Sequence, residues 1–319
     1  MSLEKIFLKQ YYQKADWIWL FLPLTCIYFF AINLRNILYK VGIFKQKKLP
    51  VKTLVIGNRI IGGAGKTQLT IFLVNFFLKK GISCGVVSRG YRGSYKHTQE
   101  VSSKSETKVV GDEPFLIKKK TGAPVVVGKS KFEAATYLLK KHKVDLLIFD
   151  DGLQNKSIKY DLSILIEDDR YVTNNFILPV GPYRELKLKN LSNNIIKISN
   201  SDKAVSNFIK FKFDKVINLK NQKVVNIKKL KNLVLSIGIG NPYKLINILK
   251  KITSFEAKIY DDHYLFTKSD FNEFYNYLLT EKDSVKCELF AQSNMWVLMP
   301  KLEVCNKFLT KLEKRIIYG

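Results

Sequence analysis

The sequence is poor in the residues that form disulfides and zinc sites. It contains four cysteines and three histidines among 319 residues. The cysteines are scattered, no Cys-x-x-Cys pair occurs, and no histidine stands at metal-ligand spacing from a cysteine. This scarcity argues against a disulfide framework and a structural zinc site, and it is typical of a protein in a reducing compartment.

Acidic residues are also scarce relative to basic ones. Lys and Arg number 54 against 27 Asp and Glu, which gives a formal net charge of +27, and the basic residues are spread along the whole chain. Such a field favours an anionic partner: nucleic acid, an acidic membrane surface or a phosphorylated substrate. A general enrichment in lysine, isoleucine and asparagine is an alternative explanation of the charge.

Charge is missing altogether from residues 17–34, WIWLFLPLTCIYFFAINL. As one helix this run would be about 27 Å long, barely enough to span a bilayer. Pro23 and Asn33 weaken a full crossing, whereas two tryptophans and a tyrosine favour the membrane–water interface. Basic residues flank both ends, so the positive-inside rule gives no orientation.

We therefore expect a membrane-associated helix within residues 1–44 that dips into one leaflet. A buried core helix and a true crossing are alternatives. A secretory signal is a weaker one, because no small-residue cleavage site follows the apolar run.

A glycine-rich motif follows the apolar stretch LPVKTLVIGN, which predicts a strand. The motif consists of Gly62, Gly63, Ala64, Gly65, Lys66 and Thr67, and a helical pattern comes directly after it. Glycines let backbone N–H groups surround phosphate oxygens, Lys66 can reach the β and γ phosphates, and Thr67 can ligate Mg²⁺. The usual pattern starts with a glycine six residues before the lysine, where this chain has Ile60. The motif predicts an ATP-binding phosphate loop.

Such a loop needs an acidic partner for the metal at the end of a second buried strand. The segment VDLLIFDDGLQ, residues 144–154, provides an apolar run followed by Asp150 and Asp151. In open α/β sheets ligands bind beyond the carboxyl ends of the strands, where this pair falls. The pair is also ordinary turn chemistry, but beside a phosphate loop we expect it to hold Mg²⁺.

Three further polar clusters interrupt the predicted elements. SRGYRG carries Arg89 and Arg92, suited to bidentate contact with phosphate. VGDEPFLI places Asp112 and Glu113 before a predicted helix, where Asp112 is a functional candidate or simply an N-cap and Glu113 is a candidate contact to substrate or phosphate. LPVGPYRE carries Arg184, either an anion contact or a solvated turn residue.

The remainder of the chain predicts a second α/β unit. LVLSIGIGNPYKLINILKK, residues 233–251, fits a strand, a glycine turn and an amphipathic helix, but it lacks Gly-Lys-Thr and is interpreted as structural. Residues 208–225 alternate apolar and basic side chains and fit one or two strands that bridge the domains. The predicted fold is α/β, a P-loop NTPase-like parallel-sheet domain with a second, smaller α/β domain and an N-terminal membrane-associated helix. Its boundaries are 1–44, 45–225 and 226–319.

The motifs taken together resemble one enzyme family. GGAGKT, SRGYRG, GDEP, DDGLQ, LPVGPYRE, IGIGNP, DDHYLFTKSD and LLTEKDSVK occur in series over nearly the whole chain. This series is similar to that of the tetraacyldisaccharide 4'-kinases, membrane-associated enzymes that make lipid IVA in Gram-negative bacteria. Any single motif would be weak, but eight in order are specific.

The resemblance implies an ATP- and Mg²⁺-dependent kinase acting on the 4'-hydroxyl of tetraacyldisaccharide 1-phosphate, in lipid A and lipopolysaccharide biosynthesis. It implies that Asp112 is the catalytic base, that His263 assists it and that Lys66 serves catalysis. Asp261 and Asp262 precede His263 where many relatives carry a second histidine, and an exposed loop histidine is the alternative for His263. We expect the His263 region to close over the phosphate loop when substrates bind.

The expected partners are the lipid substrate and an anionic membrane surface, with no nucleic acid and no protein partner. Because ATP is cytosolic and the acceptor is a lipid, the active site is expected on the cytoplasmic face of the inner membrane.

Three rival functions remain at this stage. A switch GTPase is disfavoured because TEKD, residues 280–283, has its lysine in the wrong place for a guanine-specific motif. A nucleic-acid-dependent ATPase fits the charge, but no RNA or DNA module is recognisable. A kinase for another lipid or sugar is the third.

Overall fold

The computed structural model describes residues 3–169, 172–185, 194–200, 207–240 and 242–318. Within these ranges the α-helices are α1 (Leu3–Tyr12), α2 (Leu22–Lys40), α3 (Lys66–Lys79), α4 (Thr107–Val110), α5 (Asp112–Thr121), α6 (Lys131–Lys141), α7 (Tyr243–Lys250), α8 (Glu281–Ser284) and α9 (Asn306–Ile317). Short 3-10 helices are η1 (Trp17–Phe21), η2 (Ile227–Lys229), η3 (Lys268–Asp270) and η4 (Glu288–Phe290).

The described strands join into one mixed sheet that runs through the molecule. The strands are β1 (Lys52–Asn58), β2 (Cys84–Ser88), β3 (Gln99–Glu100), β4 (Val125–Val127), β5 (Leu146–Asp150), β6 (Leu162–Asp168), β7 (Ile195–Asn200), β8 (Phe208–Asn218), β9 (Val224–Asn226), β10 (Leu233–Ile237), β11 (Glu256–Ile259), β12 (Asn276–Leu279) and β13 (Met295–Val304). Their order is β11-β10-β12-β13-β8-β7-β6-β1-β5-β2-β4-β3, with β9 beside β8.

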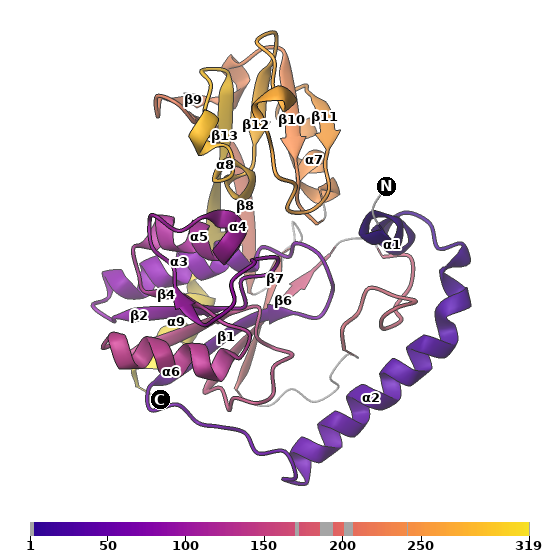
Figure 1. Cartoon of the computed structure of the whole chain (residues 1–319), viewed down its shortest axis with the longest axis vertical. Helices are drawn as coiled ribbons and strands as arrows, with labels where there is room; N and C mark the ends of the chain where they lie inside the picture. The colour runs from indigo at the N-terminus through magenta and orange to yellow at the C-terminus, as the bar shows by residue number, and fades with distance from the viewer. Residues whose placement is uncertain (1–2, 170–171, 186–193, 201–206, 241, 319) are drawn as a thin grey trace.

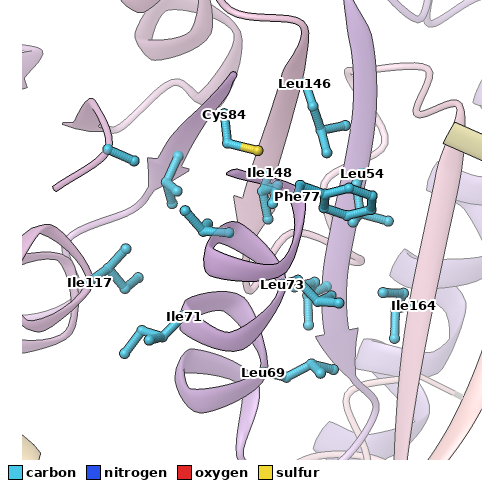
Figure 2. Close-up of a cluster of buried hydrophobic side chains, with 14 of the residues drawn as sticks. Leu54, Leu69, Ile71, Leu73, Phe77, Cys84, Ile117, Leu146, Ile148 and Ile164 are labelled. Carbon is cyan, nitrogen blue, oxygen red and sulfur yellow. The ribbon is translucent and has the colours of Figure 1, made fainter. Parts of the chain in front are cut away.

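The first lobe is a parallel sheet covered by helices on both faces, as the apolar runs predict. β1 pairs in parallel with β5 and with β6, and the partner of Ile56 on β5 is Asp150. Alternate residues of β1 face opposite layers: Leu54 packs under α3 and α5, whereas Val55 packs on the side of α6. Figure 2 shows Leu69, Leu73 and Phe77 of α3 over this sheet. The predicted α/β class with a parallel phosphate-loop domain is confirmed.

The second lobe is a smaller α/β layer, seen at the top of Figure 1 around β10, β11, β12 and β13. Ile246 and Leu249 of α7 cover one face of its sheet. Phe266, Phe271 and Tyr277 belong to a cluster on the other face.

Two long antiparallel strands connect the lobes. β8 and β13 pair along most of their length, with a register shift between Met299 and Lys301. Ile209 of β8 belongs to the core of the first lobe, and Val216 of the same strand belongs to that of the second. The prediction of strands that bridge the domains within 208–225 is therefore confirmed. Phe308 of α9 returns to the first core, and the predicted boundary at residue 225 stays a prediction.

The N-terminal segment lies at the side of the first lobe. In Figure 1, α2 runs diagonally along the edge of the molecule. Thr25, Tyr28 and Asn36 of α2 make hydrogen bonds with Val180, Arg184 and Lys156. The apolar run starts as η1 and becomes α2 at Leu22, with Pro23 in the first turn, where a proline is tolerated. Thr25 is the buried residue of α2, and Leu20, Ile27 and Phe30 are 64–79% exposed. The alternative of a buried core helix is therefore wrong.

One stretch of the described chain, Trp17–Lys40, is long and apolar enough to cross a membrane. Length and composition are the whole basis of that statement, and a signal sequence passes the same test. Tyr11 and Ile18 nevertheless pack with Ile60, so the base of this segment is attached to the phosphate-loop region.

Candidate active site

The glycine-rich motif forms the turn between β1 and α3. Gly62 and Gly65 have φ angles of +89° and +86°, in the left-handed region that side chains disfavour. A Cβ on Gly65 would also lie 2.8 Å from Cζ of Phe211, so this position has no room for a side chain. α3 then begins at Lys66, with its unpaired backbone N–H groups facing the turn. A helix N-terminus of this kind binds anions.

Lys66 lies at the end of this turn, and its ammonium contacts two side-chain oxygens. Its Nζ donates to Oδ1 of Asn58 at 2.9 Å and lies 3.6 Å from Oδ1 of Asp151. Asn58 is the last residue of β1 and is buried. Thr67 follows as the second residue of α3 and is half-buried. The structure thus places Lys66 beside the predicted metal carboxylates.

Asp150 ends β5 underneath α3. Its Oδ1 accepts a hydrogen bond from Oγ1 of Thr70 at 3.1 Å. Burial, followed by the charges of Glu113 and Asp151, raises the pKa of Asp150 to about 7. The Nζ of Lys131 donates to the backbone carbonyls of both Asp150 and Asp151 at 2.7 Å and so fixes this turn from below.

Asp151 has a φ angle of +50° and presents its carboxylate to cations. Nη1 of Arg184 donates to both of its oxygens at 3.1 Å. Burial acts to raise the pKa of Asp151, but Lys66, Arg184 and Lys131 outweigh it and hold the pKa at about 2. Asp151 is therefore ionised at neutral pH.

The donor set suits a hard cation. Carboxylate and hydroxyl oxygens of Thr67, Asp150 and Asp151 are ligands of the type Mg²⁺ takes, together with substrate phosphates. Among the described residues no group of three or more His, Cys, Asp or Glu side chains could hold a metal by itself. In phosphate-binding sites Mg²⁺ usually has one or two carboxylate ligands beside the phosphate oxygens. The three predicted metal ligands stay predictions.

Asp112 and His263 form a buried pair where the two lobes meet. Asp112 is the first residue of α5 and 4% exposed, and its Oδ1 lies 2.9 Å from Nδ1 of His263. The same oxygen accepts the backbone N–H of Glu113. The helix N-cap is Gly111, so the N-cap interpretation of Asp112 is wrong. Within the described part of the chain, the buried Oδ2 of Asp112 has no hydrogen-bond partner.

His263 is held by its own backbone and by an aromatic neighbour. Its φ is +62°, its N–H donates to the carbonyl of Gly238 at 3.1 Å, and its side chain is 8% exposed. The ring of Tyr91 meets the imidazole edge-on at 5.2 Å between centroids. The alternative of an exposed loop histidine is therefore wrong.

The charges around this pair make Asp112 an anion. Burial acts to raise the pKa of Asp112, but Lys282, His263 and Lys286 outweigh burial and hold the pKa below its ordinary value. Lys282 donates to Nε2 of His263 at 3.0 Å and to Oε1 of Glu113 at 3.1 Å. Burial acts to lower the pKa of Lys282, but the carboxylates of Glu113, Asp112 and Asp262 outweigh it and raise the pKa well above its ordinary range.

The predicted phosphate and substrate contacts lie at different depths. Arg184 lies near the phosphate loop, where it forms an ion pair with Asp151, and Glu113 forms an ion pair with Lys282. Arg92 is exposed, and its guanidinium donates to the backbone carbonyl of Asp262. Arg89 is exposed at the end of β2, close enough to Lys131 to lower the pKa of that lysine, although burial is the larger cause. Contact of these four residues with substrate stays a prediction.

The second lobe touches the phosphate loop directly. A Cβ on Gly240 would lie 3.7 Å from Cα of Gly62, and Nε2 of Gln68 donates to Oε2 of Glu281 at 2.8 Å. Gly240 belongs to the IGIGNP motif, of which Asn241 lies outside the described residues. The lobes are thus in contact here, and movement of the His263 region on binding stays a prediction.

A cavity of about 410 Å³ lies at the carboxyl ends of β1 and β6. It is lined by Asn58, Arg59, Ile60, Ile166, Glu167, Asp168, Asn175, Tyr183 and Glu185. Nη1 of Arg59 and Oε1 of Glu185 are buried and, among the described residues, have no hydrogen-bond partner. Burial raises the pKa of Glu185. Unpaired donors and acceptors of this kind favour a ligand rich in hydroxyl or amide groups.

Sequence reasoning missed three residues that organise the site. Asn58 and Lys131 gave no signal, because an Asn after a strand and a Lys opening a helix are common. Lys282 stood inside TEKD, which drew attention as a family motif and as a mismatch to a guanine-binding motif. Its contacts with Glu113 and His263 could not be predicted from its position in the chain.

Comparison with known proteins gives consistent matches. The family model described as Tetraacyldisaccharide-1-P 4'-kinase matches residues 17–317. Curated relatives named tetraacyldisaccharide 4'-kinase include one from Shewanella sp. strain W3-18-1, 33% identical over 97% of this chain and 94% of that protein. Another, from Photobacterium profundum, is 35% identical over 93% and 89%. A solved structure, LpxK from Aquifex aeolicus in complex with ATP, matches with a TM-score of 0.78 and 28% identity over 95% of this chain and all of that one.

Proposed function

The chain belongs to the tetraacyldisaccharide-1-P 4'-kinase family, and we propose that Asp112, held by His263, is the general base of its phosphoryl transfer. The enzyme is an ATP-dependent kinase that transfers the γ-phosphate to the 4'-hydroxyl of tetraacyldisaccharide 1-phosphate, forming lipid IVA in lipid A biosynthesis. The observation that carries the assignment of the base is the buried Asp112–His263 contact of 2.9 Å.

Oδ2 of Asp112, which lies 3.9 Å from Nζ of Lys286, is the proton acceptor in this mechanism. Oδ1 is occupied by His263 and the backbone of Glu113, whereas the buried Oδ2 has no hydrogen-bond partner among the described residues. Because the pKa of Asp112 is held below its ordinary value, the carboxylate is ionised when the hydroxyl arrives. It takes the proton of the 4'-hydroxyl as the new phosphorus–oxygen bond forms and the bond between the γ-phosphorus and the β–γ bridging oxygen of ATP breaks, so that ADP leaves. His263 keeps the carboxylate in orientation.

The phosphate loop positions ATP for this attack. Backbone N–H groups of residues 62–67 and the start of α3 surround the phosphates, and the Lys66 ammonium approaches the β and γ phosphates. In phosphoryl transfer most of the rate enhancement comes from positioning and charge neutralisation. Arg184, and Arg89 and Arg92 from the neighbouring loop, add positive charge on the same side of the sheet in this proposal.

Thr67, Asp150 and Asp151 would hold Mg²⁺. When bound, the ion would neutralise charge that develops on the phosphate oxygens. Asp151 contributes an ionised carboxylate to this set, whereas Asp150 is hydrogen-bonded to Thr70.

The lipid acceptor is proposed to reach the site from the membrane side. The exposed apolar residues of α2 provide an anchor, and the cavity at the carboxyl ends of β1 and β6 would hold the sugar. Lysines around α2 would be attracted to anionic lipid at about 1 kcal/mol each. ATP supply then puts the site on the cytoplasmic face of the inner membrane.

Transfer of label from [γ-³²P]ATP to tetraacyldisaccharide 1-phosphate in detergent micelles tests the whole assignment. We expect a labelled bisphosphorylated lipid with the wild-type chain and a loss of at least about 100-fold with Lys66→Ala, because the charge at the transferring phosphate is removed. Lys220→Ala, a loop lysine of the second lobe, is the matched control and keeps wild-type transfer. ATP hydrolysis without labelled lipid would contradict the acceptor and favour a switch or nucleic-acid-dependent ATPase.

A further inference from the structure

Lys282 occupies a position between the lobes that uses every hydrogen-bond donor it has. Its Nζ lies 3.1 Å from Oε1 of Glu113, 3.2 Å from Oδ1 of Asp262 and 3.0 Å from Nε2 of His263. A lysine ammonium has three N–H donors and no acceptor, so these contacts saturate it. The acceptors come from two lobes: Glu113 is on α5, and the other two are in the loop after β11.

This arrangement determines which imidazole nitrogen carries the proton. Lys282 can only donate, and at 3.0 Å it is nearer to Nε2 of His263 than Oδ2 of Asp262 is at 3.5 Å, so we assign Nε2 as the acceptor that carries no proton. Nδ1 must then be the protonated nitrogen, and it faces Oδ1 of Asp112 at 2.9 Å. In the opposite tautomer, two donors would face each other at Nε2 and two acceptors at Nδ1.

We propose that Lys282 is a positioning residue for the proton-accepting pair: it fixes His263 as the Nδ1–H tautomer and ties the His263 loop to the start of α5. This inference rests on the proposed role of Asp112 as the base. The consequence is that His263 donates to Asp112 rather than competing with it for the proton of the acceptor hydroxyl.

Charged groups from both lobes surround the pair. Oδ2 of Asp262 lies 3.5 Å from Nε2 of His263. Lys282 and Lys286 approach from α8 and the turn after it, with Lys286 at 3.9 Å from Oδ2 of Asp112. Glu113 lies on α5 beside Asp112, Asp262 is adjacent to His263, and the Arg92 guanidinium contacts the Asp262 backbone. Of the charges that lower the pKa of Asp112 against burial, Lys282 is the largest.

Because the charge of Lys282 lowers the pKa of Asp112, a variant without this charge should show a different pH dependence. Removing Lys282 lets the pKa of Asp112 rise. As pH falls, Asp112 of the variant is therefore protonated at a higher pH than Asp112 of the wild type, and the variant loses activity at that higher pH. We expect Lys282→Met to lower kcat by about 10- to 100-fold at pH 7, with the KM for ATP nearly unchanged, and the deficit to shrink as pH rises. Lys282→Arg, which keeps the charge, restores part of the loss.

Lys120→Met is the matched control. Lys120 also joins α5 to α8, through a 2.5 Å ion pair with Glu281, and this ion pair includes neither His263 nor Asp112. It should keep the wild-type pH profile. A deficit in Lys282→Met that is constant with pH, or a profile that Lys120→Met shares, would overturn the proposal and indicate a merely structural lysine.

A spectroscopic readout separates this proposal from the proposed function. The chain has three histidines, so ¹⁵N-imidazole spectra in micelles can be assigned with His97→Gln and His142→Gln variants. We expect the Nδ1–H tautomer for His263 in the wild type and its loss in Lys282→Met. An Nε2–H tautomer, or an unchanged signal in Lys282→Met, overturns the role of Lys282. Full turnover by Asp112→Asn would instead overturn the base, whereas the histidine spectra of the wild type and Lys282→Met test the role of Lys282 separately.

Discussion

Asp150 and Asp151 are adjacent in the chain but have opposite protonation tendencies. Asp150 ends β5 beneath α3, and burial raises its pKa to about 7. The next residue leaves the strand with a φ of +50° and meets Lys66 and Arg184, which hold its pKa at about 2 against burial. One carboxylate is therefore permanently charged near the phosphate loop, while the other belongs to the packed layer below it. The two pKa values differ because Asp150 is the last residue of the buried strand and Asp151 is the first residue after it.

Gly65 combines a left-handed φ of +86° with a close approach of the Phe211 ring. We expect Gly65→Ala to weaken ATP binding by at least about tenfold and to destabilise the fold by more than the roughly 1–2 kcal/mol of a left-handed alanine, because its Cβ would also meet Phe211 at 2.8 Å. Nucleotide titration and thermal unfolding measure these effects.

Gly122→Ala is the control, since Gly122 has a φ of +68° but nothing within 4 Å of the added Cβ. It should lose some thermal stability and no affinity for ATP. Equal ATP affinity in Gly65→Ala and the wild type would contradict the account of the loop.

At the scale of elements, the sequence predicted the helices, strands and turns whose residues are contiguous in the chain. β1, the phosphate turn and α3 are contiguous, so Lys66 and the glycines could be assigned without any tertiary information. The buried run before Asp150 predicted β5 for the same reason. The pairing of β8 with β13 could not be predicted, because it joins Lys215 with Met299 across most of the second lobe. The return of α9 to the first core, through Phe308, is likewise a long-range packing choice.

The site shows the same limit. Asp112 and His263 were proposed as partners through the family resemblance, since they lie on α5 and in a distant loop. Their burial and the contacts of Lys282 depend on how the two lobes meet. A sequence pattern reports neighbours along one element and not the ion pairs between lobes.

α2 exposes several large apolar side chains. Ile27 and Phe30 are 64% and 69% exposed, so the double variant Ile27→Gln/Phe30→Gln should lower binding to anionic phosphatidylglycerol vesicles by at least about tenfold. Cosedimentation with the vesicles at low and high salt measures this binding. High salt should weaken vesicle binding by the wild type, because lysines contribute to the attraction to anionic lipid. Phe274→Gln, at an 82% exposed residue of the second lobe, is the control. Equal vesicle binding by the double variant would contradict the anchor.

At the scale of the whole molecule, one sheet carries both halves of the reaction. β1 and β5 position the phosphate loop and Asp151, while the second lobe brings His263 and Lys282 onto Asp112 from the other side. The net charge of +27 surrounds this arrangement, and both of its proposed ligands, ATP and an anionic lipid, are negative. Fold and charge thus favour bringing two anions together, with the proton acceptor between the lobes.

Single-turnover transfer from [γ-³²P]ATP to tetraacyldisaccharide 1-phosphate by Asp112→Asn tests the central claim most directly, with Asp214→Asn, an exposed aspartate on β8, as the control. The asparagine keeps the shape of the side chain but cannot accept the hydroxyl proton as a carboxylate does. The account predicts that Asp112→Asn binds ATP with wild-type affinity and transfers phosphate at least about 100-fold more slowly. A wild-type transfer rate in Asp112→Asn would contradict it.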